Sequence, residues 1–380
     1  MLDPVFRPVE LPAHLIGRPA PCDFFDARGT LLLRAGAPIV AHRKQAPQPR
    51  RMFCEARVAE RLSPVDPIVA LRAAGATLSQ LADQARGGVP PAASELVALA
   101  QTLHELWLLD ADACIGYARL VQFERPSVRH ALLTALFTAE LAAANGLARH
   151  VALAVIGAAA TMNIASMDFH DEMHAHVGRP DAAMRDEIRE HPQEAANLLE
   201  RSGPLPQDWL DAVAQHHENF DGSGYPLGLK RGGITLGARM LRIADILAAR
   251  LTGRKRRAPR HWGIHHARDP QHLVQHVFGS DLEQLDQTLV RLLMARLGAF
   301  PPGTLVRLDN GELAVVSRRR PDARTTPREV LAFLGSHGRP LETPRVRQIG
   351  PRECRIHSYA HDELPRLPQI AWQRMWGYPQ

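Results

Sequence analysis

Residues 216–229 read HHENFDGSGYPLGL. We expect the adjacent histidines His216 and His217 to end a helix, where their side chains point roughly 100° apart and could serve two neighbouring metal ions. The glycines and the proline that follow predict a tight loop beside the histidines. Tyr225 in this loop offers an aromatic face on which a nucleotide base could stack. The stretch therefore indicates metal and nucleotide chemistry.

The sequence around this stretch predicts helices. From Ala92 to about Arg250, Ala, Leu and Glu recur at three- and four-residue spacing, which is typical of helices in a bundle. One helix is predicted to begin near Ser127 and to end at Asn145 and Gly146, because these two residues tolerate the left-handed conformation that closes a helix. Two more helices are predicted over 149–163 and 281–297.

Short β-strands are predicted near both ends of the chain. Residues 8–40 alternate apolar runs with turns, and Ala27-Arg28-Gly29 lies between two such runs as a hairpin turn would. Residues 304–319 alternate around Asn310-Gly311, a dipeptide typical of a two-residue hairpin. The prolines and basic residues of 45–51 predict an exposed loop.

These patterns predict a mainly α protein in which a helical bundle is flanked by small β-rich modules at the N- and C-terminal ends. The composition, 45% hydrophobic and 23% charged, is typical of folded protein. The predicted domains are 1–90, a small N-terminal module with its linker, 91–299, the helical domain, and 300–380, the C-terminal module.

Charge and hydropathy limit the classes of partner. No apolar run reaches the 18 or so residues of a membrane helix, and the first ten residues lack the apolar core of a secretory signal, so we expect a cytoplasmic protein without a membrane span. The net charge of +6 favours anionic partners. Nucleic acid is not expected, because no helix-turn-helix or basic-aromatic groove is recognisable. The four cysteines form no CxxC pair and predict no zinc knuckle.

A longer motif includes the opening stretch. Residues 216–245 read HHENFDGSGYPLGLKRGGITLGARMLRIAD, which resembles HHExxDGSGYPxGLxxxxIxxGARxLxxAD, the signature of the HD-GYP phosphodiesterases. The resemblance extends from about Ser127 to Arg257. It implies an HD-GYP helical bundle around two or three metal ions, usually iron or manganese, which bind and hydrolyse cyclic di-GMP.

The resemblance also implies which residues hold the metal ions. The family ligands that this chain retains fall on His130, His191, His216, His217 and Asp245, with Pro192 after His191 as in the family. The His-Asp pair that names the family is replaced by Met162 and Asn163, and the phosphate-facing lysine by Ser166. The optional glutamate of a third metal falls on Pro126, so a third ion is not expected.

These replacements affect the expected chemistry. The neutral Asn163 cannot supply the bridging charge that holds two dications together, and the thioether of Met162 is a poor ligand for iron or manganese. Ser166 cannot supply the positive charge of a lysine. We therefore expect no intact catalytic centre. The remaining ligands could hold one divalent ion, such as Fe, Mn or Zn, or could instead hydrogen-bond to one another in a metal-free polar pocket.

Two further groups of residues follow from the resemblance. The expected nucleotide contacts are Tyr225, Arg254 and Arg257, although a solvated basic tract at 253–260 is the alternative. The loop formed by Gly224, Tyr225 and Pro226 is associated in the family with docking to GGDEF-type diguanylate cyclases, so such a cyclase, or another signalling protein, is an expected partner beside cyclic di-GMP.

Other histidines are given no role. His272 and His276 have helical spacing but no third ligand nearby in the sequence, and His170-Asp171, with His174 and His176, is expected to lie in a loop after the helix. The leading hypothesis is thus a catalytically impaired cyclic-di-GMP signalling protein that senses the nucleotide or docks a partner. The alternative is an active phosphodiesterase that uses the surviving ligands.

Overall fold

The structure is a computed structural model that describes most of the chain. The described residues are 65–252, 277–319, 329–350 and 352–378, with residues 274 and 327 and parts of 6–62. Several predictions fall outside them: the turn at 27–29, the loop at 45–51, the basic residues Arg254 and Arg257, and the pair His272 and His276. The chain divides into two compact units, Met1–Asp66 and Pro67–Gln380.

The first unit is a small antiparallel sheet of strand order β1-β4-β2-β3. Its strands are β1 (Phe6–Val9), β2 (Phe24–Phe25), β3 (Leu31–Leu33) and β4 (Met52–Glu55). Strands β2 and β3 pair with each other, as the hairpin prediction requires. Phe24 and Cys54 are completely buried in a small core. The predicted β-rich N-terminal module is confirmed.

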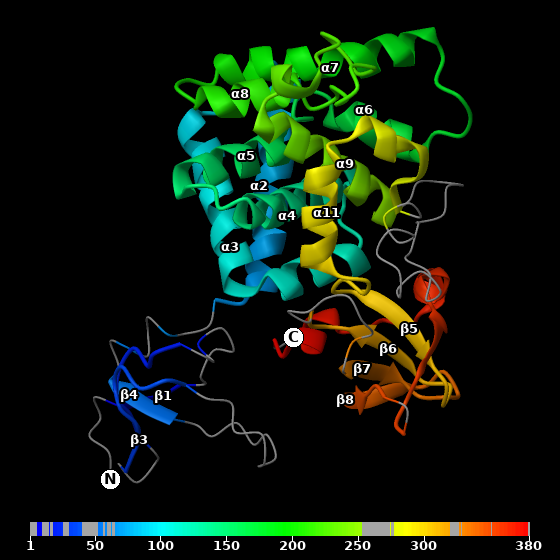
Figure 1. Cartoon of the computed structure of the whole chain (residues 1–380). Helices are drawn as coiled ribbons and strands as arrows, with labels where there is room; N and C mark the ends of the chain where they lie inside the picture. Colours follow the sequence, from blue (N-terminus) through cyan, green and yellow to red (C-terminus); the bar gives the residue numbers. More distant parts are fainter. Residues whose placement is uncertain are drawn as a thin grey trace. The chain divides into compact units, whose positions relative to one another are not determined.

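The second unit contains a helical bundle (Figure 1). Its main helices are α2 (Pro67–Arg86), α3 (Ala93–Leu120), α4 (Pro126–Ala144), α5 (Arg149–Thr161), α6 (Met167–Ala175), α7 (Ala182–Glu200), α8 (Gln207–Ala214), α9 (Leu236–Thr252) and α11 (Gln287–Leu297). Helix α4 packs against α3, α5, α9 and α11, and it is buried on every face, as its apolar sequence requires. Across the described residues, no helix is long and apolar enough to cross a membrane. The predicted bundle is confirmed.

The ends of two helices position the residues discussed below. Helix α4 begins at Pro126, whose missing N–H costs no hydrogen bond in the first turn. It ends at the predicted place, since Asn145 caps it and Gly146 follows with a φ of +65°. Helix α5 ends at Thr161, slightly before the predicted end at residue 163. Residues 162–166 then form the turn that leads into α6.

Helix α2 lies before the predicted domain boundary at residue 90, yet it belongs to the second compact unit. It packs against α3 and α4 and buries Leu71, Leu78 and Leu81 along one stripe. Because the other bundle helices cover this stripe, the helix is part of the bundle rather than of a linker. The division into three domains stays a prediction.

The C-terminal part of the second unit is an antiparallel sheet of strand order β8-β7-β6-β5-β9. The strands are β5 (Thr304–Leu308), β6 (Leu313–Val316), β7 (Glu329–Leu334), β8 (Pro340–Gln348) and β9 (Ile356–Tyr359). Strands β5 and β6 form the hairpin predicted around Asn310-Gly311, and Gly311 has a φ of +83°. The predicted β-rich C-terminal module is confirmed.

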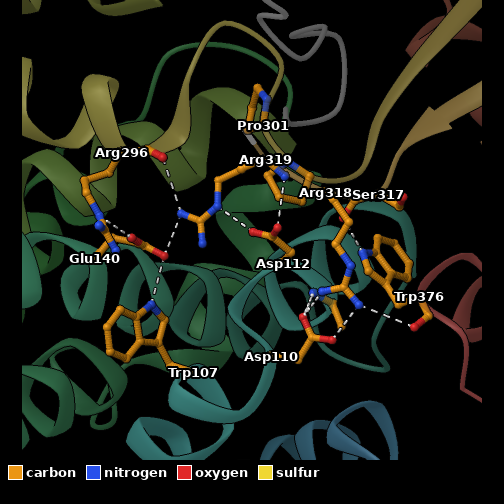
Figure 2. A network of polar contacts seen from close by, with 12 residues as sticks. Trp107, Asp110, Asp112, Glu140, Arg296, Pro301, Ser317, Arg318, Arg319 and Trp376 are labelled. Carbon is orange, nitrogen blue, oxygen red and sulfur yellow. Dashed lines mark hydrogen bonds and ion pairs between the residues drawn. The ribbon is translucent and has the colours of Figure 1, made fainter. Parts of the chain in front are cut away.

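Charged side chains anchor this sheet to the bundle (Figure 2). Just after β6, Arg318 forms a two-armed ion pair with Asp110 of α3, with Nη2 at 2.8 Å from Oδ2. Arg319 pairs with Asp112 and also reaches the fully buried carboxylate of Glu140 on α4 at 2.7 Å. The sheet is therefore held on α3 and α4 by buried charges as well as by apolar packing.

Candidate functional site

A cavity of about 610 Å³ is lined by residues of α4, α6 and α9 and of the loops next to them. The predicted ligands His130, His217 and Asp245 line it, together with Asn163. The rings of His191 and His216 lie against the ring of His217, with centroid distances of 4.9 and 4.3 Å. The structure thus brings all five predicted ligands into one region.

His130 and Asp245 face each other from α4 and α9, two helices that pack together. The distance from His130 Nε2 to Asp245 Oδ1 is 2.8 Å. Burial alone would raise the pKa of Asp245, but the hydrogen bond from His130, the charge of His130 and the charge of Arg242 hold that pKa well below its usual range. Asp245 is therefore an ionised acceptor, and His130 donates the proton between them.

His191 and His216 are oriented by backbone carbonyls. His191 Nδ1 lies 2.9 Å from the carbonyl oxygen of Ile188, and His216 Nδ1 lies 2.6 Å from that of Val213. A carbonyl oxygen only accepts, so both Nδ1 atoms carry a proton. Burial is the main cause that lowers the pKa of His191 to about 4 and of His216 to about 3. At neutral pH both rings are therefore neutral, with a lone pair on Nε2.

These two lone pairs face each other. The Nε2 atoms of His191 and His216 are 3.2 Å apart. A tetrahedral ion with bonds of about 2.0–2.1 Å to two ring nitrogens separates those nitrogens by roughly 3.3 Å. Hydrogen bonds from the other ring nitrogen to a carbonyl are also the usual way of orienting a metal-binding histidine. This pair is therefore preorganised for one cation.

In His217 the proton lies on the other ring nitrogen, because Arg242 contacts Nδ1. Arg242 Nη1 lies 3.0 Å from His217 Nδ1, and a guanidinium can only donate. Neutral His217 therefore keeps its proton on Nε2 and offers no free lone pair. Arg242 Nη1 is also 3.7 Å from Asp245 Oδ2. The guanidinium thus lies between two predicted metal ligands.

The loop after His217 is held rigidly beside the site. The buried carboxylate of Glu218 accepts hydrogen bonds from the backbone N–H groups of Leu227, at 2.6 Å, and Leu229, at 2.9 Å. A Cβ on Gly224 would lie 2.2 Å from the backbone nitrogen of Asn219, so only glycine fits there. One face of the Tyr225 ring stacks on His217, with centroids 4.7 Å apart. That face is consequently turned to the histidine and not to a ligand.

Comparisons with known proteins agree with the motif. The family model of the HD domain matches residues 114–264. A cyclic di-GMP phosphodiesterase of Pseudomonas aeruginosa is 31% identical over 160 residues, which is 42% of this chain and 32% of that protein. The 3′3′-cGAMP-specific phosphodiesterase 2 of Vibrio cholerae is 30% identical over 126 residues, 33% of this chain and 24% of that one. Residues 114–264 form an HD domain.

The matched part of the chain spans about a third of the length of the first of these relatives and about a quarter of the second. Among solved structures, an HDG"Y"P protein from Bdellovibrio bacteriovorus is similar at 12% identity, with a TM-score of 0.46 over 76% of this chain and 98% of that chain.

The residues at the HD-GYP family's named pair lie at the expected helix end. Met162 follows α5 directly and is buried in the hydrophobic core, and the cavity-lining residues do not include it. Asn163 does line the cavity, and within the described part of the chain its buried Oδ1 has no hydrogen-bond partner. The Oγ of Ser166 is also buried and has no hydrogen-bond partner among the described residues. A buried amide oxygen without a hydrogen bond lowers the stability of the fold. Because this oxygen carries no charge, it also binds hard cations weakly.

The expectation that residues 170–176 form a loop is wrong. Helix α6, Met167–Ala175, contains His170 and His174, and both line the cavity. The ring of His170 is 5.3 Å from that of His191. Asp171 instead accepts a hydrogen bond from the backbone N–H of Ser127 at 2.7 Å, at the start of α4. The helix is short and polar, so its sequence has no apolar periodicity that would predict it. The spacing of four residues between the two histidines could have indicated that they share one face of a helix.

The HD domain family is metal-dependent, and the ring nitrogens of His191, His216 and His217 lie within 4.8 Å of one another, close enough to hold a metal ion. The facing Nε2 atoms of His191 and His216 fit one ion. A second ion does not fit, because Arg242 places a positive charge between His217 and Asp245 and because Asn163 supplies no bridging carboxylate.

Proposed function

We propose that this chain is a cyclic-di-GMP signalling protein that binds the nucleotide in the cavity described above and lacks an effective catalytic centre. The observation that carries the proposal is the guanidinium of Arg242 between His217 and Asp245, next to a neutral Asn163. Hydrolysis of a phosphodiester at a two-metal site needs both ions, one for the attacking and one for the leaving oxygen.

Two relatives named as cyclic-dinucleotide phosphodiesterases support the class of ligand. The volume of the cavity, about 610 Å³, falls within the usual size of small-molecule sites. If a metal ion binds between His191 and His216, it supplies a Lewis acid there. His130 would then remain hydrogen-bonded to Asp245. The Nδ1–H groups of His191 and His216 would keep these two rings in place through their backbone carbonyls.

The loop after His217, which contains Gly224, Tyr225 and Pro226, supports an additional role in docking. Leu227 is 65% exposed on a loop that Glu218 holds in one conformation. An exposed apolar side chain on a rigid loop loses little conformational freedom when it binds a partner. We propose a GGDEF-type diguanylate cyclase as that partner. Biolayer interferometry with such a cyclase is expected to give binding that Leu227→Asp weakens at least about tenfold, whereas equal binding by both proteins rejects the docking role.

The nucleotide role is tested with the full chain. Isothermal titration calorimetry with cyclic di-GMP is expected to show binding, and chromatography after incubation with Mn²⁺ or Fe²⁺ is expected to show no pGpG or GMP above a protein-free control. Turnover that disappears in His216→Ala would instead establish the alternative, an active phosphodiesterase that uses one metal ion. The retained His191 and His216 pair is the observation that favours this alternative.

A further inference from the structure

Arg242 is held in the cavity by three contacts. Its Nε donates to Asn219 Oδ1 at 3.1 Å, and its Nη1 donates to His217 Nδ1 at 3.0 Å and lies 3.7 Å from Asp245 Oδ2. Asn219 is itself fixed, because its Nδ2 donates to Ser223 Oγ at 3.0 Å. The guanidinium is therefore oriented before any ligand arrives.

One end of this guanidinium remains available. Arg242 lines the cavity, and within the residues that the structure describes its Nη2 has no hydrogen-bond partner. The planar fork of a guanidinium matches the oxygens of a phosphate group and keeps its charge at every physiological pH. A phosphate oxygen is the natural acceptor for an N–H group in this position.

Two other arginines, Arg129 and Arg250, also line the cavity. Arg250 pairs with Asp281 through Nη2, while its buried Nη1 has no partner among the described residues. Arg129 donates from Nε to the carbonyl oxygen of Ala118 at 2.7 Å and from Nη2 to that of Arg119, and among the described residues it forms no ion pair with a carboxylate. Beside the exposed Glu124, the carboxylates of the lining are Asp245 and Asp281. The lining thus carries three arginines against three carboxylates, and N–H groups that remain for an anion are on Nη2 of Arg242 and Nη1 of Arg250.

We propose that Arg242 takes the place of a metal ion as the phosphate-binding cation, so that the cavity binds the phosphodiester of its ligand without any metal. In a two-metal site the positive charge that attracts a phosphodiester comes from the ions. Here a side chain supplies it between the same ligands, His217 and Asp245. The proposal rests on the proposed function for the identity of the nucleotide, but the phosphate contact can be tested separately.

The test compares two variants of the full chain in EDTA and in added Mn²⁺. Arg242→Met keeps the length and removes the charge, and Arg242→Lys keeps the charge. Arg149→Met, on an exposed arginine of α5, is the matched control. Calorimetry with cyclic di-GMP is expected to give the same affinity for the parent with and without EDTA. Arg242→Met should bind at least about tenfold more weakly, and Arg242→Lys should recover part of the loss.

The outcomes separate this inference from the proposed function. Parent binding that EDTA abolishes, Mn²⁺ restores and Arg242→Met leaves unchanged overturns the inference. A purely structural role for Arg242 would change the melting temperature without changing affinity, and it would overturn the inference as well. If cyclic di-GMP fails to bind, inorganic phosphate is the second probe, followed by ³¹P NMR in EDTA. Phosphate binding that depends on Arg242 then keeps the inference while the proposed function fails, and its absence rejects both.

Discussion

Arg242 carries a permanent positive charge between two side chains that would otherwise be metal ligands, His217 and Asp245. A dication beside a guanidinium is repelled, whereas the carboxylate is stabilised by it. The same charge decides which nitrogen of His217 holds the proton. One side chain therefore changes the charge and the ligand set of half the site.

The neutral histidines His191 and His216 predict how stability depends on pH. Burial lowers their pKa values from 6.5 to about 4 and about 3, so the unfolded chain binds more protons than the folded chain below pH 6.5. Stability is therefore expected to fall as the pH decreases from 6.5 towards 4. Urea denaturation between pH 7.5 and 4.5 measures the free energy of unfolding at each pH. His216→Gln should reduce the slope of this free energy against pH. An equal slope in parent and variant contradicts the assignment.

The sequence predicts which histidines cluster in the site, but not their protonation or their hydrogen-bond partners. His130, His191 and His216 could be placed because the motif and its spacing match a known family. Arg242 could not be singled out, because the signature leaves its position free. Hydrogen-bond partners such as the carbonyl of Ile188 depend on the folded backbone, which no pattern of residue types specifies.

Two elements, α5 and α8, set the positions of Asn163 and His216, because each of these residues lies two residues after the end of one of the helices. The helices pack at Gly157 of α5 and Trp209 of α8, and the Trp209 Nε1–H donates to Thr161 Oγ1 at 2.9 Å. Close contact between these helices thus fixes the width of the site.

Gly157→Ala is expected to force these helices apart. A Cβ at residue 157 would lie 2.0 Å from the Trp209 ring, which is a fully packed position. Overpacking of this kind lowers the free energy of unfolding by about 1–3 kcal/mol. Chemical denaturation measures the change. Gly232→Ala is the control, since its Cβ meets nothing within 4 Å. Equal stability of the two variants would show that α5 and α8 accommodate the added methyl group without a loss of stability.

At the element scale, the sequence predicts long apolar helices well and short polar ones poorly. The sequence predicts a helix from near Ser127 to Asn145-Gly146, and α4 runs from Pro126 to Ala144. Helix α6 was missed because it buries only Met167 and Phe169, which gives no apolar stripe to detect. Its histidines reach the cavity only through the packing of α6 on α4.

The second compact unit joins its sheet to its bundle through charges that are far apart in the sequence (Figure 2). Glu140 is completely buried and accepts from Trp107 Nε1 at 2.9 Å and from Arg296 Nε at 3.0 Å, in addition to its pair with Arg319. Such long-range pairs cannot be predicted from sequence spacing. They link the C-terminal sheet to α4, the helix that carries His130.

Removal of Arg319 is expected to destabilise the whole second unit. The fully buried Glu140 and the partly buried Asp112 would both lose a partner. The loss costs about 3 kcal/mol, a value near the lower end for a broken buried pair because Arg296 still contacts Glu140. Thermal and urea unfolding of Arg319→Ala measure the change. Arg149→Ala is the control, because Arg149 and Glu105 are 62% and 67% exposed and their pair contributes about 0–1 kcal/mol. A loss no larger than that of the control contradicts the anchoring role.

For the chain as a whole, we propose that no two-metal centre assembles. The most direct measurement is the metal content per chain, by inductively coupled plasma mass spectrometry, after saturation with Mn²⁺, Fe²⁺ or Zn²⁺ and removal of excess ion. We expect at most one ion per chain in the parent, and the same in Met162→His with Asn163→Asp as long as Arg242 is present. Two tightly bound ions per chain in the parent would contradict it.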